Sequence, residues 1–128
     1  MPDSNLKLEQ LKLAYDYTKF HVGLYGTLIT GLIAILKYCE GTPYVFFLKI
    51  TVCLFLIAAM CGAILASSFL DAYGSYEFWQ SEIGDFWESK IGPFKWKWFK
   101  AKTWGFIEHA AFWVGILVVV CAFLLKAR

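Results

Sequence analysis

The sequence predicts an all-α membrane protein with three transmembrane helices, an N-terminal helical extension and an amphipathic connector before the last helix. Apolar residues make up 59% of the chain, and charged residues make up only 17%. Residues 50–70 form an uninterrupted run of 21 residues without a charge. A helix needs roughly 20 mostly apolar residues to cross a hydrocarbon core of about 30 Å. This combination is typical of a polytopic membrane protein rather than a soluble enzyme.

Residues 1–19 have the periodicity of an amphipathic helix, with Leu8, Leu11 and Tyr15 on one face. Because no Gly or Pro separates them from the first span at residues 20–38, we expect one continuous helix. At 1.5 Å per residue, residues 4–38 would be about 52 Å long, which exceeds the membrane thickness. The first turns are therefore expected either at the membrane surface or in a bundle with other subunits.

Small residues recur every four positions in the first span, at Gly23, Thr27 and Gly31. This spacing lets helices approach closely in lipid, and it also suits the lining of a narrow pore. The segment CEGTPY (residues 39–44) then predicts a tight turn, so the first two spans form an antiparallel hairpin.

The second span, residues 44–70, carries a further small-residue stripe at Ala58, Gly62 and Ala66. We expect this helix to be the packing hub of the molecule.

The connector at residues 71–103 is too long for a passive turn. Its first half places Trp79, Ile83, Phe86 and Trp87 on one helical face, with carboxylates on the rest. This pattern is typical of a helix that lies at the membrane interface or docks a partner.

The second half of the connector interleaves lysines with aromatic residues in the segment KWKWFKAK (residues 95–102). Lysines attract phosphates and aromatic rings stack on unpaired bases, which is the combination needed to bind single-stranded nucleic acid. The same composition suits an anionic membrane surface, with tryptophans at headgroup depth and lysines above them. The residue types alone leave both interpretations open.

The third span covers residues 104–125, and the basic residues predict its orientation. Eight lysines lie on the side of the N-terminus and the connector, against four basic residues on the other side. The larger group is Lys7, Lys12, Lys19, Lys90, Lys95, Lys97, Lys100 and Lys102; the smaller is Lys37, Lys49, Lys126 and Arg128. The positive-inside rule then predicts a cytoplasmic N-terminus. We expect a multi-pass protein of the cell inner membrane.

Four ionisable residues fall at a similar depth near the cytosolic ends of the spans: His21, Asp71, Glu108 and His109. Such residues usually face a bundle interior or a water-filled cavity, so they suggest a polar vestibule at the mouth of a pore. The alternative is simple contact with headgroups and water at the membrane boundary. Because Glu108 and His109 are adjacent, they point about 100° apart on a helix, and we expect no metal site.

We also expect neither catalysis nor a cofactor. The sequence has no Gly-x-Ser-x-Gly, no His-Glu-x-x-His and no glycine-rich phosphate loop. The spacing of its four cysteines fits neither a zinc site nor a disulfide framework.

Three spans in a short chain, a helical cytosolic N-terminus and the KWKWFKAK connector resemble small membrane effectors of bacterial anti-phage systems, in particular the Hailong type. The resemblance implies an oligomeric channel held shut by single-stranded DNA oligomers, which a cytosolic nucleotidyltransferase-like partner makes. The DNA-sensing role would then fall on Lys95, Trp96, Lys97, Trp98 and Lys100, with Lys7, Lys12 and Lys19 as further candidates.

The expected function is therefore a homo-oligomeric channel or pore in the lipid bilayer, gated from the cytosol and acting in antiviral defence. A non-conducting accessory or anchoring subunit of a larger membrane complex is one alternative. A membrane-surface sensor that binds anionic lipid is another.

Overall fold

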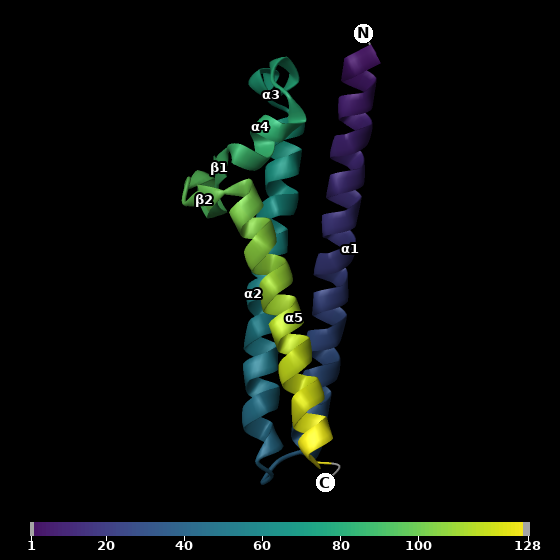
Figure 1. Ribbon diagram of the computed structural model, residues 1–128, viewed down its shortest axis with the longest axis vertical. Coiled ribbons are helices and arrows are strands. Elements are labelled where there is room, and N and C mark those ends of the chain that lie inside the picture. The colour runs from purple at the N-terminus through teal and green to yellow at the C-terminus, as the bar shows by residue number, and fades with distance from the viewer. Residues whose placement is uncertain (1, 127–128) are drawn as a thin grey trace.

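The computed structural model of the protein describes residues 2–126, with the side chains of residues 2, 3, 95 and 126 outside that description. Three long helices run side by side along the molecule: α1 (Pro2–Tyr38), α2 (Tyr44–Tyr73) and α5 (Ala101–Lys126) (Figure 1). Each is long and apolar enough to cross a membrane. The predicted fold class, an all-α multi-pass membrane protein, is confirmed.

Helix α1 is continuous from the extension through the first span, as the absence of Gly and Pro between them predicts. The turn after it contains Gly41 at φ +81°, a left-handed conformation that glycine adopts without a steric penalty. The turn reverses the chain, so α1 and α2 are antiparallel (Figure 1). Helix α2 extends three residues past the predicted end at Leu70, and α5 begins three residues before Trp104.

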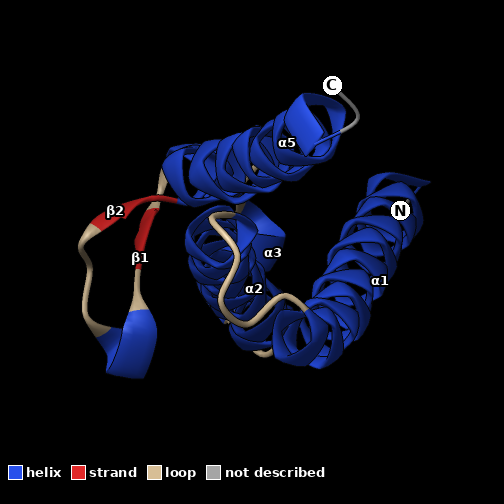
Figure 2. Ribbon diagram, turned by 90° about the horizontal axis from the view of Figure 1, so that it is seen from below, coloured by secondary structure: helices blue, strands red, loops and turns tan. Residues whose placement is uncertain are grey.

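Helix α2 is the central helix and packs against both α1 and α5. Figure 2 shows this arrangement from below, with α1 and α5 diverging on either side of α2. Glycines allow the close approaches: a Cβ at Gly62 would lie 2.7 Å from Cγ2 of Val22, and one at Gly115 would lie 2.6 Å from Cε1 of Phe55. The stripe of small residues on the second span thus serves packing within the chain.

The N-terminal extension packs on the α2 helix and the connector of its own chain. Leu11 is only 4% exposed and belongs to an apolar cluster with Leu65 and Phe69 of α2. The Lys7 ammonium donates hydrogen bonds to the carbonyls of Phe78 and Ser81 in the connector. The extension therefore continues the bundle beyond the apolar shaft, because the connector supplies it with an apolar surface.

The connector folds into two short helices, α3 (Tyr76–Gln80) and α4 (Ile83–Glu88), followed by a hairpin. The sequence pattern predicts a single helix here, but Ser81 and Glu82 adopt extended backbone conformations and break it. The Asp85 carboxylate accepts a hydrogen bond from the Glu82 amide and so begins the new helix.

The aromatic face of the connector is turned inward. Phe86 is 7% exposed and stacks on Phe69 of α2 with ring centroids 4.9 Å apart, and Trp79 and Trp87 are half-buried beside it. The expected interfacial or partner-docking surface is therefore occupied by the chain's own α2.

The hairpin that follows pairs β1 (Lys90–Ile91) with β2 (Phe99–Lys100) in an antiparallel register. A single 3-10 turn, η1 (Pro93–Lys95), lies in its loop. The hairpin projects to one side of the bundle at the point where α5 begins (Figure 1).

Candidate functional site

A buried carboxylate lies between the three long helices. Glu108, in the second turn of α5, is 1% exposed and accepts a hydrogen bond of 3.0 Å from the Tyr25 hydroxyl of α1. The α2 backbone leaves room for it at Gly62, where a Cβ would lie 3.4 Å from Oε1 of Glu108. Ionisable residues within membrane-spanning helices are expensive to bury and commonly mark a functional pathway.

Two histidines lie beside this carboxylate. The rings of His21 and His109 have centroids 5.8 Å apart. Each ring also contacts the backbone one helical turn earlier. Nδ1 of His21 lies 2.8 Å from the Tyr17 carbonyl oxygen, and Nδ1 of His109 lies 2.8 Å from the Gly105 carbonyl oxygen. Because a carbonyl only accepts, Nδ1 is protonated in both rings. In the neutral ring, Nε2 of His109 therefore accepts the 3.2 Å hydrogen bond from the Tyr17 hydroxyl.

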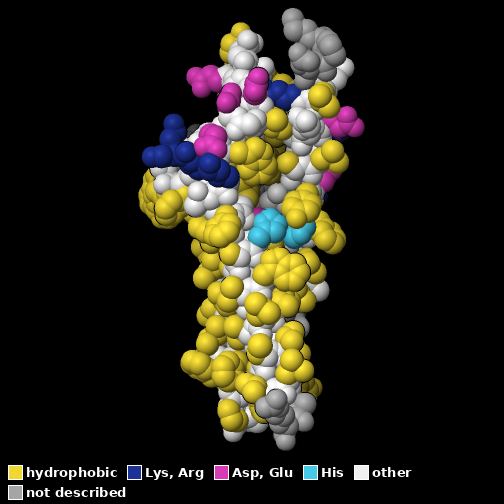
Figure 3. All heavy atoms as spheres, in the orientation of Figure 1, with side chains coloured by type: hydrophobic (Ala, Val, Ile, Leu, Met, Phe, Trp, Pro, Cys, Tyr) yellow, Lys and Arg dark blue, Asp and Glu magenta, His cyan; other side chains and the backbone are white. Residues whose placement is uncertain are grey.

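We refer to these five residues, Tyr17, His21, Tyr25, Glu108 and His109, as the His–Glu cluster. Figure 3 shows the two histidines where the charged end of the molecule meets the hydrophobic shaft. A cavity of about 660 Å³ opens beside them, and its lining includes Asp16 and Trp87 as well as Glu108 and His109. The cluster is thus accessible from the end of the molecule that carries the connector.

Of the four residues predicted to line a vestibule, the structure brings His21, Glu108 and His109 together and leaves Asp71 apart. Asp71 follows Gly62 by nine residues, which is two and a half helical turns, so it lies on the opposite face of α2. It lines a separate groove of about 800 Å³ with Lys90 and Lys97.

Sequence reasoning missed Tyr17 and Tyr25. Both share a helical face with His21, since the three residues are spaced four apart. This spacing could have indicated that the two tyrosines lie beside His21.

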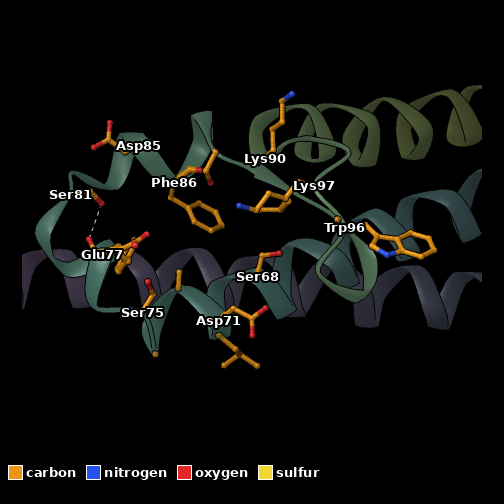
Figure 4. Close-up of a pocket in the computed structure, with 17 residues that line it drawn as sticks. Ser68, Asp71, Ser75, Glu77, Ser81, Asp85, Phe86, Lys90, Trp96 and Lys97 are labelled. Atoms are coloured by element: carbon orange, nitrogen blue, oxygen red, sulfur yellow. Dashed lines mark hydrogen bonds between the residues drawn. The ribbon is translucent and has the colours of Figure 1, made fainter.

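The structure describes the side chains of four of the five residues assigned to nucleic-acid binding, and these four make different contacts. Trp96 and Trp98 stack on each other with ring centroids 5.5 Å apart, whereas Lys97 points into the groove beside Phe86 (Figure 4). Lys100 donates a 2.9 Å hydrogen bond to Glu88, and the Lys95 side chain lies outside the described part of the chain. Lys102 also bonds Glu88, at 2.5 Å, and these two lysines, Lys102 first, lower the pKa of the Glu88 carboxyl.

Among the further lysine candidates, Lys7 is 9% exposed, and its ammonium already donates hydrogen bonds to two carbonyl oxygens of the connector. Lys12 and Lys19 are exposed.

Among the side chains that the structure describes, no group of three or more His, Cys, Asp or Glu could hold a metal ion. The cluster provides one carboxylate and two imidazoles whose Nδ1 atoms already bond backbone carbonyls. It can attract a cation or relay a proton.

Comparison with known proteins finds no matching family model, no matching curated protein and no matching solved structure. The class that the fold defines is a multi-pass membrane protein with a polar cluster at one end of its apolar shaft.

Proposed function

We propose that this chain is the subunit of a homo-oligomeric ion channel or pore in the cell inner membrane, with its N-terminus and connector in the cytoplasm. The observation that carries the proposal is Glu108, a buried carboxylate hydrogen-bonded to Tyr25 near the end of the spans from which the connector leaves. Burying such a group is destabilising, and anchoring a protein in the membrane does not require it. The proposal includes no catalytic role.

An oligomer is needed because three helices packed on one another enclose no conduit. Helix α1 supplies a surface for association: a Cβ at Gly23, Gly26 or Gly31 would meet nothing within 4 Å among the described residues. Small residues on an uncovered helix face let a second helix approach closely in lipid. Cyclic symmetry is the expected arrangement, with the opening between α1 and α5 facing the axis.

The chemistry of the His–Glu cluster suits cation conduction. A ring of carboxylates, one from each subunit, would attract cations and repel anions at the mouth of the pore.

Gating from the cytosol is supported by the route from the connector to the cluster. Lys7 ties the start of α1 to α3, and Trp87 of α4 lines the same cavity as Glu108. A ligand that moves the connector would therefore move α1 and reshape the cavity. Single-stranded DNA made by a nucleotidyltransferase-like partner, in an anti-phage defence system, is the trigger that the resemblance implies and the first one to test.

The test is ion flux from liposomes that contain the purified protein and a potassium-sensitive dye, with and without a short single-stranded DNA. We expect flux in one of the two conditions and a loss of at least tenfold in Glu108→Gln, while Glu9→Gln, an exposed carboxylate on the extension, conducts normally. A wild-type protein that is impermeable in both conditions would refute the channel.

The second candidate function is a non-conducting accessory or anchoring subunit. The uncovered glycines of α1 favour it as much as they favour a homo-oligomer, since another protein's helix could pack there. It predicts a monomer when the purified chain is solubilised, whereas the channel predicts one stable homo-oligomer.

A further inference from the structure

The hairpin before α5, residues 89–100, is held firmly at its base. The Ala101 amide donates a 2.9 Å hydrogen bond to the Ser89 carbonyl, and the Trp104 indole donates one of 2.9 Å to the Ile91 carbonyl. Glu88 adds two ion pairs, at 2.9 Å with Lys100 and 2.5 Å with Lys102. The loop is thereby fixed in position relative to α5 and is not a free tether.

The loop of this hairpin displays aromatic rings. Phe94 is 90% exposed and adopts φ +55°, a conformation that a bulky residue avoids unless its surroundings require it. Trp96 and Trp98 are more than half exposed even though they stack on each other. So much apolar surface concentrated on one loop indicates that something other than water covers it.

The packing register gives the depth of the hairpin. Glu108 lies beside Gly62, and Gly105 lies beside Leu65, so the antiparallel α2 and α5 bring Ala101 level with Phe69. Ala101 and Phe69 indeed belong to one apolar cluster. The hairpin, which leads directly into Ala101, is therefore level with the end of the uncharged run at residues 50–70.

Helix α1 gives the same level. It runs parallel to α5 and pairs Tyr25 with Glu108, which brings the start of its own apolar run at Phe20 level with Thr103. The uncharged run of α2 is about 30 Å long, the thickness of a hydrocarbon core. All three spans thus reach the membrane boundary at the height of the hairpin.

The hydrophobic and the basic side chains of the hairpin region lie on opposite sides of this membrane boundary. In Figure 3 its hydrophobic side chains lie on the side of the apolar shaft, and its lysines lie on the side of the charged end. Lys100 and Lys102 both pair with Glu88, and Lys90 and Lys97 form no ion pair among the described residues, so positive charge is in excess at the hairpin. Tryptophans at headgroup depth with lysines above them match the charge and polarity of an anionic membrane surface.

We propose that the hairpin is a membrane-interface anchor: its aromatic rings enter the headgroup layer of the surrounding bilayer, and its lysines bind anionic headgroups. This goes beyond the proposed channel and holds whether or not the chain conducts ions. It also selects between the two interpretations of KWKWFKAK. Trp96 and Trp98 stack on each other, which leaves less ring surface for stacking on bases, so the arrangement favours lipid over nucleic acid.

The experiment uses the full chain labelled with 5-fluorotryptophan in lipid nanodiscs, followed by fluorine NMR. The Trp96 and Trp98 signals are assigned with Trp96→Phe and Trp98→Phe. A lipid with a nitroxide on its headgroup should broaden both signals beyond detection, and a water-soluble relaxation agent should leave them visible. Trp79, half-buried in the connector, is the internal control that headgroup nitroxide should spare.

The anionic preference is tested by comparing discs of phosphatidylcholine alone with discs that also contain phosphatidylglycerol. We expect stronger headgroup broadening in the second, and the difference should disappear when Lys90 and Lys97 are both changed to Gln. Equal broadening in the two discs would refute the charge contribution.

Two results would overturn the anchor itself. In the first, Trp96 and Trp98 are broadened by the water-soluble agent and not by the lipid. In the second, a single-stranded DNA oligomer shifts both signals and abolishes their broadening by lipid, which would assign the hairpin to nucleic acid instead.

Discussion

The Tyr25 hydroxyl of α1 donates a 3.0 Å hydrogen bond to the Glu108 carboxylate of α5, and this bond joins two helices that otherwise pack mainly on α2. It satisfies a carboxylate that is 1% exposed, in a place where water cannot do so freely. Together with the 3.2 Å hydrogen bond between Tyr17 and His109, it fixes the position of α1 relative to α5.

Replacing Tyr25 by Phe removes this contact and leaves the carboxylate buried without its donor. We expect a loss of about 1–3 kcal/mol in the free energy of unfolding. The measurement is unfolding by sodium dodecyl sulfate in mixed micelles. Tyr38→Phe, at a ring that is 88% exposed, is the matched control and should change little. Equal stability of the two variants would show that the bond contributes nothing.

Gly62→Leu should disrupt the bundle, because even a Cβ at this position would lie 2.7 Å from Val22. Overpacking of this kind costs about 1–3 kcal/mol. The same micelle titration measures it, with Leu56→Ile as control, since Leu56 is 46% exposed on the same helix. If both variants were silent, α2 would be an anchor and not the packing hub.

Gly31→Leu on α1 should weaken the association of subunits without destabilising the single chain. A Cβ there meets nothing within 4 Å in the described part of the chain, so we expect the fold of one subunit to be preserved. We expect instead a shift from oligomer to monomer, measured by light scattering of the detergent-solubilised protein. Ile33→Leu, at a neighbouring exposed position, is the control. An unchanged oligomer would exclude this face of α1 from the subunit contact.

The base of the hairpin should loosen in acid. Hydrogen bonds from Lys102 and Lys100 lower the pKa of the Glu88 carboxyl from its ordinary value of 4.5. A lowered folded-state pKa means that the stabilisation is present above pH 4.5 and is lost as the pH falls through the folded-state value. The fluorine signal of Trp98 should then titrate with a midpoint below 4.5.

Glu88→Gln should remove this titration, whereas Glu77→Gln should retain it. A midpoint at or above 4.5 in the unchanged chain would contradict the ion pairs.

The spans and the continuity of α1 could be read from the sequence because they follow from local features: the uncharged run at residues 50–70 and the absence of Gly and Pro before Phe20. The site could be predicted in part. His21, Glu108 and His109 share a depth that residue counting reveals. Counting does not show which face of a helix a residue occupies, and Asp71 lies on the face of α2 that points away from Glu108.

The inward turn of Phe86 and Trp87 depends on tertiary packing against Phe69. An amphipathic pattern shows that a face needs cover, and it does not show what provides the cover. For the same reason, the burial of Lys7 under the connector could not be foreseen from its charge.

The central claim is that copies of this chain surround a conduit lined by the His–Glu cluster. Electron microscopy of the detergent-solubilised protein, with and without a short single-stranded DNA, tests it most directly. We predict a ring of identical subunits with cyclic symmetry in which the opening between α1 and α5, with Glu108 behind it, faces the central axis. A monomer, or a ring in which that opening faces lipid, would contradict the claim.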